Sequence, residues 1–318
     1  MTSAVETFAG YVATLGRGPG RSRPLTRGEA EDAMRLLLQG HVDPLQIGAF
    51  LMLLRYRGED PDEITGLVTA ARAHTALPGL NVALDWPSYG AGKSRGAPWF
   101  LLAALALGRA GYPVLMHGTN EFSAGITVSD ALRLLGLAPA EDAAQARADL
   151  AKTGFAYVPI ASLCPAFAKL LGLRRLFGLR SPINTVARLL NPADAPAGVD
   201  GVFHPPYIET HLAAAERLHR PRLLVLKGGG GEAERNPAKP VTAHLWVQGE
   251  GRREFSLAPL CDADSAEPPD FAAFWRGTTR HAAVEARVIG TIALGLLAMG
   301  CGDDATAQTL WESRARSR

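Results

Sequence analysis

Four features that the 318-residue chain lacks limit its possible classes before any motif is considered. Its cysteines, Cys164, Cys261 and Cys301, are odd in number and far apart, so they suggest neither a disulfide framework nor a paired metal or redox motif. A reducing, cytoplasmic compartment fits this cysteine usage. The first residues lack a basic stretch followed by an apolar run, so we expect no secretory signal.

Long apolar runs and a strong net charge are also missing. Residues 289–299 form the most apolar segment, about half of the ~20 residues that span a bilayer, so we expect a buried helix and no membrane partner. The net charge of +2 is too small to prove a polyanionic partner. Cations do cluster, although a solvated surface explains each cluster equally well. The clusters are Arg17, Arg21, Arg23 and Arg27; Lys169, Arg174, Arg175, Arg180 and Arg188; and Arg314, Arg316 and Arg318.

The first 75 residues carry the signals of a helical segment. Thr26 and Glu29 have the spacing of a capping box, and Gly40 can close that helix. Asp-Pro pairs at residues 43–44 and 60–61 mark two further helix starts. Apolar residues then recur at helical spacing and predict one buried face. They are Leu45, Ile47, Phe50, Leu51 and Leu54.

From about residue 81 onward, short apolar runs alternate with helical patterns. We expect strands at 81–86, 113–116, 155–159 and 222–226, and helices at 97–110, 128–136, 141–152 and 205–219. This alternation predicts a mainly parallel sheet covered by helices. We also expect a hairpin of residues 243–248 and 253–257, helices at 268–276, 279–299 and 304–316, and a linker at 192–198. The fold class is therefore α/β.

A glycine-rich motif follows the first expected strand. Residues 87–94 match the phosphate-binding pattern GxxxxGK[ST] except that Pro87 replaces the first glycine. In that pattern backbone N–H groups surround phosphate, with Lys93 as the counter-charge and Ser94 as a magnesium ligand. No later expected strand ends in the acidic residue that such a metal needs, because residues 222–226 run into Lys227. The sequence therefore argues against a nucleoside triphosphatase.

Two more loops follow expected strands. One begins at His117-Gly118, and the other runs from Lys227 through four glycines to Glu232. Glycines permit close approach to a ligand or serve a sharp turn, so each loop alone supports either interpretation. Three such loops at three strand ends indicate a shared crevice.

Few side chains in these loops form a catalytic pattern. His117 has no helix-spaced partner for a metal, which favours a hydrogen-bonded structural histidine. Glu232 and Glu234 could hold a hydrated magnesium, but a solvated loop face is the simpler account. His204 precedes two prolines and is interpreted as a helix-entry residue. We find no nucleophile-elbow pattern.

Several segments occur in the order of a known family. They are residues 36–40, 46–52, 57–59, 117–118, 130–132 and 135–136, Arg180 with Asn184, residues 190–192, and the terminal helices. In these the chain resembles the anthranilate phosphoribosyltransferase family, which shares its fold with pyrimidine nucleoside phosphorylases. The resemblance implies a small N-terminal helical domain, residues 1–76, with helices from about 163–190 packing on it. A larger α/β glycosyltransferase-like domain, residues 77–318, would follow.

The donor site of that family is altered in this chain. Its Gly-Thr-Gly-Gly-Asp loop aligns with residues 88–93, its Asn-x-Ser-Thr start with 97–101, and its Lys-His-Gly-Asn with 116–119. Its magnesium-binding Asp-Glu pair aligns with Gly231-Glu232 or its neighbours, so at most part of the pair is kept. Charge-assisted phosphate contacts contribute about 1.5–3 kcal/mol each, and several are missing. The resemblance thus implies a vestigial donor site and no anthranilate phosphoribosyltransferase activity. That site comprises Gly90, Gly92, His117, Gly118 and Glu232.

Residues 87–89, 114–118 and Cys164-Pro165 are more similar to a divergent branch, the YbiB-type proteins. This resemblance implies a homodimer that binds DNA or RNA without sequence preference, needs no cofactor, and uses arginines to follow the phosphate backbone. The sequence does not separate DNA from RNA. The residues we expect to bind nucleic acid are Lys93, Arg95, Lys169, Arg174, Arg175, Arg180, Arg188 and Lys227.

The alternative is an enzyme of the same fold, a glycosyl or phosphoribosyl transferase with an altered substrate. It would catalyse displacement at an anomeric carbon, and only in that case would Mg²⁺ assist a leaving pyrophosphate. Turnover of anthranilate with phosphoribosyl pyrophosphate would favour the enzyme, and salt-sensitive binding of nucleic acid would favour the other hypothesis.

Overall fold

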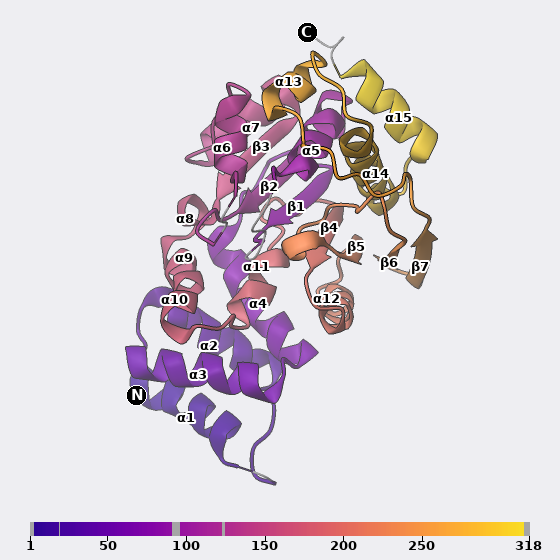
Figure 1. Cartoon of the computed structure of the whole chain (residues 1–318). Coiled ribbons are helices and arrows are strands. Elements are labelled where there is room, and N and C mark those ends of the chain that lie inside the picture. The colour runs from indigo at the N-terminus through magenta and orange to yellow at the C-terminus, as the bar shows by residue number, and fades with distance from the viewer. Residues whose placement is uncertain (1–2, 19, 91–95, 123–124, 315–318) are drawn as a thin grey trace.

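The structure is a computed structural model that describes residues 3–18, 20–90, 96–122 and 125–314. Four helices at one end form a bundle, and the rest of the chain builds an α/β body above it (Figure 1). The bundle helices are α1 (Ala4–Gly16), α2 (Arg27–Gln39), α3 (Pro44–Arg57) and α4 (Pro61–Thr75). The observed class, a helical unit followed by a larger α/β unit with a mainly parallel sheet, confirms the predicted fold.

The ends of the bundle helices follow the predicted capping signals. Thr26 and Glu29 form a reciprocal capping box on α2, and Gly40 ends that helix in the left-handed conformation at φ +73°. Asp43 and Asp60 cap α3 and α4, each followed by proline in the first turn. The predicted apolar face of α3 is wrong at one position: Phe50, Leu51 and Leu54 are buried, whereas Leu45 is 84% exposed. Leu45 lies on the opposite side of α3, in its first turn.

One seven-stranded sheet runs through the body in the order β3-β2-β1-β4-β5-β6-β7. The first five strands along the chain are parallel, and β6 and β7 add an antiparallel hairpin at one edge. Gly249 and Gly251 at the hairpin turn have positive φ, as expected for its tight connection. The strands are β1 (Leu84–Ser88), β2 (Val114–Gly118), β3 (Phe155–Pro159), β4 (Ala197–Val202), β5 (Arg222–Lys227), β6 (Val241–Val247) and β7 (Gly251–Leu257).

Strand β4 overlaps the stretch that we interpreted as a linker, residues 192–198. It lies in the middle of the sheet between β1 and β5 and is buried throughout. Its sequence, Ala-Gly-Val-Asp-Gly-Val, has little apolar alternation because small residues are needed there. A Cβ at Gly201 would lie 2.1 Å from the backbone carbon of Glu232, so close approach of the β5 loop explains the glycine.

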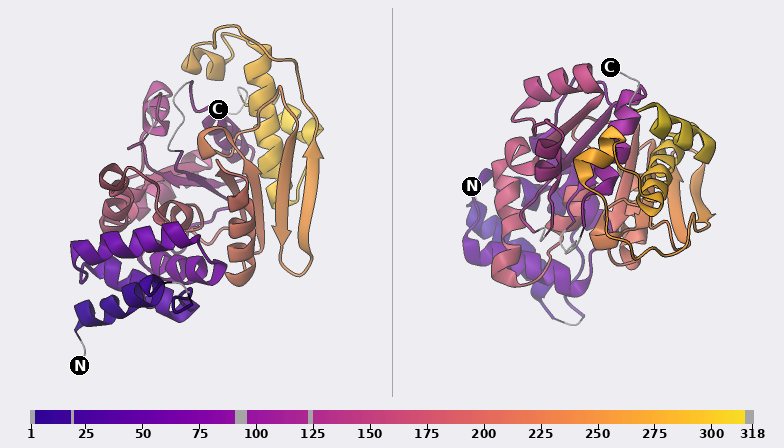
Figure 2. Two further views of the ribbon diagram at one scale, coloured as in Figure 1. Left: turned by 60° about the horizontal axis from the view of Figure 1, so that its bottom comes forward. Right: turned by 45° about the horizontal axis from the view of Figure 1, so that its top comes forward.

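Helices cover both faces of the sheet. One core joins the sheet to α5, α13, α14 and α15, and a second joins it to the bundle and α9, α11 and α12. Figure 2 shows α14 and the β6–β7 hairpin lying side by side. The body helices are α5 (Trp99–Arg109), α6 (Val128–Leu134), α7 (Ala143–Thr153), α8 (Ile160–Leu163), α9 (Pro165–Gly172), α10 (Arg174–Phe177), α11 (Ile183–Arg188), α12 (Pro206–Arg217), α13 (Phe271–Arg276), α14 (Ala282–Met299) and α15 (Asp304–Ser313).

Among the described helices, α14 alone is long and apolar enough to cross a membrane. Half of its apolar window is buried inside the protein, where it packs against α5, α15 and strands of the sheet. Such burial is typical of a core helix and agrees with the buried helix expected for residues 289–299.

Candidate functional site

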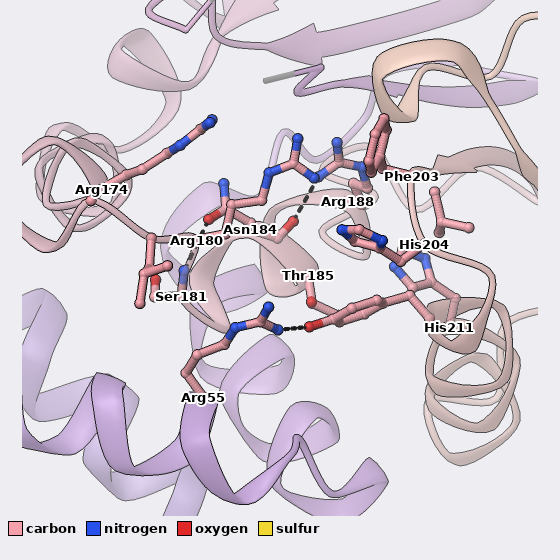
Figure 3. Close-up of a pocket in the computed structure, with 14 residues that line it drawn as sticks. Arg55, Arg174, Arg180, Ser181, Asn184, Thr185, Arg188, Phe203, His204 and His211 are labelled. Carbon is pink, nitrogen blue, oxygen red and sulfur yellow. Dashed lines mark hydrogen bonds between the residues drawn. The ribbon is translucent and has the colours of Figure 1, made fainter. Parts of the chain in front are cut away.

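A cavity of about 340 Å³ opens where the helical bundle meets the α/β body. Helix α3 contributes Arg55, α10 and the following loop contribute Arg174 and Arg180, and α11 contributes Arg188. The wall therefore carries four guanidinium groups, and the described lining residues include no aspartate or glutamate. In Figure 3, Arg180 and Arg188 lie along one side, Arg55 lies opposite them, and Arg174 faces the side formed by Phe203, His204 and His211.

Arg180 lies in a strongly cationic environment. Burial, followed by the nearby charges of Arg188 and Arg174, lowers the pKa of the Arg180 guanidinium to about 10. Its guanidinium carbon lies 5.6 Å from the centre of the Phe203 ring, within the range of a cation–π contact. A bound anion would stabilise this cluster, because its attraction to each guanidinium offsets the repulsion between the like charges.

Arg188 is buried at the cavity wall, where its guanidinium donates to backbone carbonyl groups. Its Nε donates to the carbonyl of Gly201 at 3.1 Å, and Nη1 donates to the carbonyl of Asn184 at 2.9 Å. Its Nη2 donates to the carbonyl of Tyr89, also at 2.9 Å. Burial lowers the pKa of Arg188, while nearby Glu232 and Asp200 oppose that effect. Arg188 therefore ties the backbone at Tyr89 and at Gly201 to its own helix, α11.

Arg55 belongs to a polar network behind the opposite wall. It donates to the hydroxyl of Tyr207, which in turn donates to Glu59 Oε1 at 3.3 Å. The Thr185 hydroxyl donates to Glu59 Oε2 at 3.0 Å. Burial raises the pKa of the Glu59 carboxyl despite these contacts and the charge of Arg55. Because α3, the loop after it, α11 and α12 supply these groups, the network ties the bundle to the body beside the cavity.

A buried aspartate fixes the histidine on the cavity wall. His211 Nδ1 lies 2.7 Å from Asp200 Oδ2, and both residues are at most 1% exposed. Asp200 belongs to the central strand β4, and His211 lies in the second turn of α12. The other oxygen, Asp200 Oδ1, has no hydrogen-bond partner among the described residues. The imidazole is therefore oriented chiefly by one contact.

The three predicted loops do meet at one edge of the sheet, after β1, β2 and β5. The backbone N–H of Gly90, after β1, donates to the carboxylate of Glu232, after β5. Tyr89 and His117, at the ends of β1 and β2, are joined by a 2.8 Å hydrogen bond between the phenol oxygen and Nδ1. Gly118 is packed so closely that a Cβ there would lie 2.0 Å from the carbonyl of Ser88.

Below the loops, His117 is part of a buried polar chain. Its Nε2 lies 3.2 Å from Asp85 Oδ1, and Arg220 Nη2 lies 3.3 Å from Asp85 Oδ2. The interpretation of His117 as a hydrogen-bonded structural histidine is consistent with these contacts.

The solvated loop face expected for Glu232 and Glu234 is wrong. Both residues are under 9% exposed, and Glu234 accepts hydrogen bonds from the Phe100 N–H at 3.0 Å and from Arg287 at 3.1 Å. Among the described residues no group of three or more metal-ligating side chains is present. Because both carboxylates accept hydrogen bonds from N–H donors, this pair does not fit a magnesium cage.

The remaining predicted residues lie apart from the cavity. Lys169 is exposed on α9, Arg175 is exposed on α10 with its Nε 3.1 Å from Glu121, and Lys227 is exposed at the end of β5. Gly92, Lys93 and Arg95 lie outside the described residues. Arg174, Arg180 and Arg188 are thus the predicted nucleic-acid-binding residues that line the cavity.

Sequence reasoning missed several lining residues, among them Phe203 and four polar or charged side chains. Arg55, Tyr207 and His211 were not considered, and His204 was interpreted only as a helix-entry residue, although it lines the cavity just before α12. One signal was available: His204, Tyr207 and His211 are spaced i, i+3 and i+7, which puts them on one face of a helix.

The chain thus combines a helical bundle and an α/β body with a ligand-sized cavity between them. The helical bundle domain profile of the glycosyl transferase family matches residues 10–75, and the profile of its a/b domain matches residues 100–261. The chain belongs to this family, in its anthranilate phosphoribosyltransferase-like group.

Individual relatives support the assignment. The uncharacterized protein YbiB of Escherichia coli (strain K12) is 30% identical over 75% of this chain and 76% of its own length. Anthranilate phosphoribosyltransferase of Gluconobacter oxydans (strain 621H) is 31% identical over 77% of this chain and 69% of its own. The crystal structure of anthranilate phosphoribosyltransferase from Thermus thermophilus superposes with a TM-score of 0.79 at 26% identity, covering 98% of this chain and 94% of the other. The fold and ancestry are thus those of a glycosyl or phosphoribosyl transferase of the anthranilate type.

Proposed function

We propose that this protein is a glycosyl or phosphoribosyl transferase that takes a small organic anion in the arginine-lined cavity. One observation carries the proposal: four guanidinium groups line the cavity, and no carboxylate does so among its described lining residues. Guanidinium groups match the planar geometry of carboxylate and phosphate oxygens. Ring stacking is available at Phe203, which already lies beside Arg180. An aromatic or heterocyclic carboxylate fits both features.

The donor side supports a weakened donor site. Glu232 places a carboxylate against the Gly90 N–H, where the related transferases have a phosphate-binding loop. A negative side chain at that point lowers the affinity for the diphosphate donor. Since the described carboxylates do not make a magnesium site, any Mg²⁺ would have to arrive with the donor.

Binding and turnover of known substrates of the relatives test this proposal. Purified protein would be titrated with anthranilate by calorimetry, and product formation from anthranilate and phosphoribosyl pyrophosphate with Mg²⁺ would be followed by fluorescence. We expect Arg180→Gln to weaken anthranilate binding about tenfold or more, because a charge-assisted contact contributes about 1.5–3 kcal/mol. Arg175→Gln is the matched control, since this exposed arginine lies outside the cavity lining. Equal affinity of both variants would contradict the proposal.

A second candidate is sequence-nonspecific binding of DNA or RNA. It is favoured by exposed Lys169 and Arg175, which extend the cationic character of the cavity along α9 and α10. Anisotropy titration with labelled single-stranded DNA and RNA at several salt concentrations tests it, because phosphate contacts release counterions. Here Arg175→Gln should weaken binding, and anthranilate should leave it unchanged if the cavity is not involved.

We also propose a homodimer in which the bundle contributes to the interface. Leu45 and Tyr56 are 84% and 92% exposed and lie eleven residues apart on α3, hence on one side of the helix. Leu176 of α10 is 81% exposed, and the ring of the adjacent Phe177 lies 3.8 Å from the position of a Cβ at Gly48 of α3. Large apolar side chains that are this exposed are typical of an interaction surface. Sedimentation velocity of Leu45→Lys should show a monomer, and a wild-type monomer would refute the proposal.

A further inference from the structure

The cavity wall holds a carboxylate–imidazole pair that anion binding does not use. His211 lines the cavity, and its Nδ1 is held at 2.7 Å by Asp200 on the central strand. A carboxylate accepts hydrogen bonds only, so Nδ1 carries the proton in the neutral ring. The opposite nitrogen, Nε2, is then a proton acceptor.

The position of the pair is rigid. Asp200 is flanked in β4 by Val199 and Gly201, which pair with Leu224 and Leu226 of β5. Burial of Asp200 without another hydrogen-bonded side chain would be costly, and the charge of nearby Arg188 partly offsets that cost. An imidazole held this firmly needs little reorganisation before proton transfer.

We propose that His211 is the general base of the transfer reaction and Asp200 its positioning residue; this inference rests on the proposed function. The acceptor is an organic anion that carries an N–H or O–H nucleophile beside the carboxylate or phosphate held by the arginines. Its nitrogen or oxygen lone pair forms the bond to the anomeric carbon of a pentosyl diphosphate. The bond from that carbon to the diphosphate oxygen breaks, and its electron pair leaves with the diphosphate. The acceptor proton passes to His211 Nε2 and then to water.

The charges around the ring fit this role. Glu59 is close enough for His211 to lower the pKa of its carboxyl, so a protonated imidazole has a second carboxylate nearby. That carboxylate stabilises the imidazolium that forms during transfer. Arg55 pairs with Glu59 at 3.8 Å, and the charge of Arg188 acts on Asp200. Neither arginine makes a described hydrogen bond to the imidazole.

The full-length protein with ¹⁵N-labelled histidine provides the test. Two-bond nitrogen–proton spectra assign the tautomer, and the signals lost in His211→Gln identify this ring among the eight histidines. We expect the Nδ1–H tautomer in the wild type and a shift of the Nε2 resonance when anthranilate is added. Asp200→Asn should abolish the tautomer preference. His244→Gln is the matched control, because His244 Nδ1 lies 3.4 Å from Glu254 on the distant hairpin.

Kinetic measurements distinguish a general-base role of His211 from a purely structural role of the His211–Asp200 pair. We expect His211→Gln and Asp200→Asn to lower kcat by about 10²–10⁴, the usual contribution of general base catalysis, with KM for anthranilate nearly unchanged. Anthranilate binding without movement of the Nε2 resonance, or full kcat in His211→Gln, would overturn the inference while the transferase stands. Failure of the wild type to bind anthranilate would refute both.

Discussion

Arg220 and Asp85 form an ion pair that is buried beneath the crevice, with Nη2 3.3 Å from Oδ2 and both residues at most 2% exposed. The other oxygen of Asp85 faces His117 Nε2 at 3.2 Å. We expect Arg220→Met to lower the free energy of unfolding by about 3–5 kcal/mol, because it leaves a buried carboxylate without its cation. Urea unfolding monitored by tryptophan fluorescence measures the change.

Arg217→Met is the control for that prediction. Arg217 pairs with Asp62 at 2.6 Å, but both side chains are more than one third exposed. A surface pair contributes about 0–1 kcal/mol, so this variant should unfold near the wild-type midpoint. Similar losses in both variants would show that the burial of the Asp85 pair has no energetic consequence.

The carboxylate of Glu232 gives a prediction for the donor crevice. It accepts a hydrogen bond from the Gly90 N–H and repels an incoming anion. We expect Glu232→Gln to bind inorganic pyrophosphate about tenfold more tightly, since removal of one like charge at a partly screened distance changes the free energy by about 1.4 kcal/mol. Calorimetric titration measures the affinity. Glu234→Gln is matched in burial and charge but is held by Arg287, so its affinity should stay near that of the wild type.

The sequence was a good guide where local chemistry decides the structure. The capping box of Thr26 and Glu29, the left-handed Gly40 and the glycines of the β6–β7 turn were all predictable, because each depends on neighbouring residues. Strand β1 was expected three residues too early at its start and two at its end, since Pro87 and Ser88 belong to it. Pairing with β2 extends the strand into residues of low strand propensity.

The rest required tertiary information. Strand β4 could not be predicted from its glycines, because the groups that crowd them come later in the sequence. Gly201 faces the Glu232 backbone, and Gly198 faces Arg220 and Leu223. The cavity likewise joins Arg55, Arg180 and His211 from three separate segments. No local pattern links these residues, so only the packing of the bundle on the body brings them together.

Glu59 predicts how stability depends on pH. Burial raises the pKa of its carboxyl above the ordinary value of 4.5, so the folded state holds the proton more tightly than the unfolded chain. Its contribution is fully present below about pH 4.5 and is lost as the pH rises through the folded pKa. We compare the unfolding free energy of the wild type with that of Glu59→Gln. The value for the wild type minus that for the variant should be larger at pH 4.5 than at pH 7.

Glu29 should give the opposite sign in the same experiment. A hydrogen bond from Arg23 lowers the pKa of Glu29 to about 2, so its contribution is present above pH 4.5 and is lost as the pH falls through about 2. The unfolding free energy of the wild type minus that of Glu29→Gln should thus be larger at pH 7 than at pH 3. Difference curves of the same slope for both glutamates would contradict the assigned environments.

Two glycines in the bundle helices separate packing from helix propensity. A Cβ at Gly66 of α4 would lie 2.2 Å from the backbone oxygen of Arg27 in α2, whereas a Cβ at Gly10 of α1 would meet no atom within 4 Å. Both changes to alanine gain about 0.5–1 kcal/mol of helix propensity. We expect Gly10→Ala to raise the free energy of unfolding by that amount. Gly66→Ala should lower it by about 1–3 kcal/mol, because α2 must move away from α4. Urea midpoints of the two variants, compared at unchanged m-value, measure both changes. A stabilised Gly66→Ala would mean that the close contact between α2 and α4 relaxes without cost.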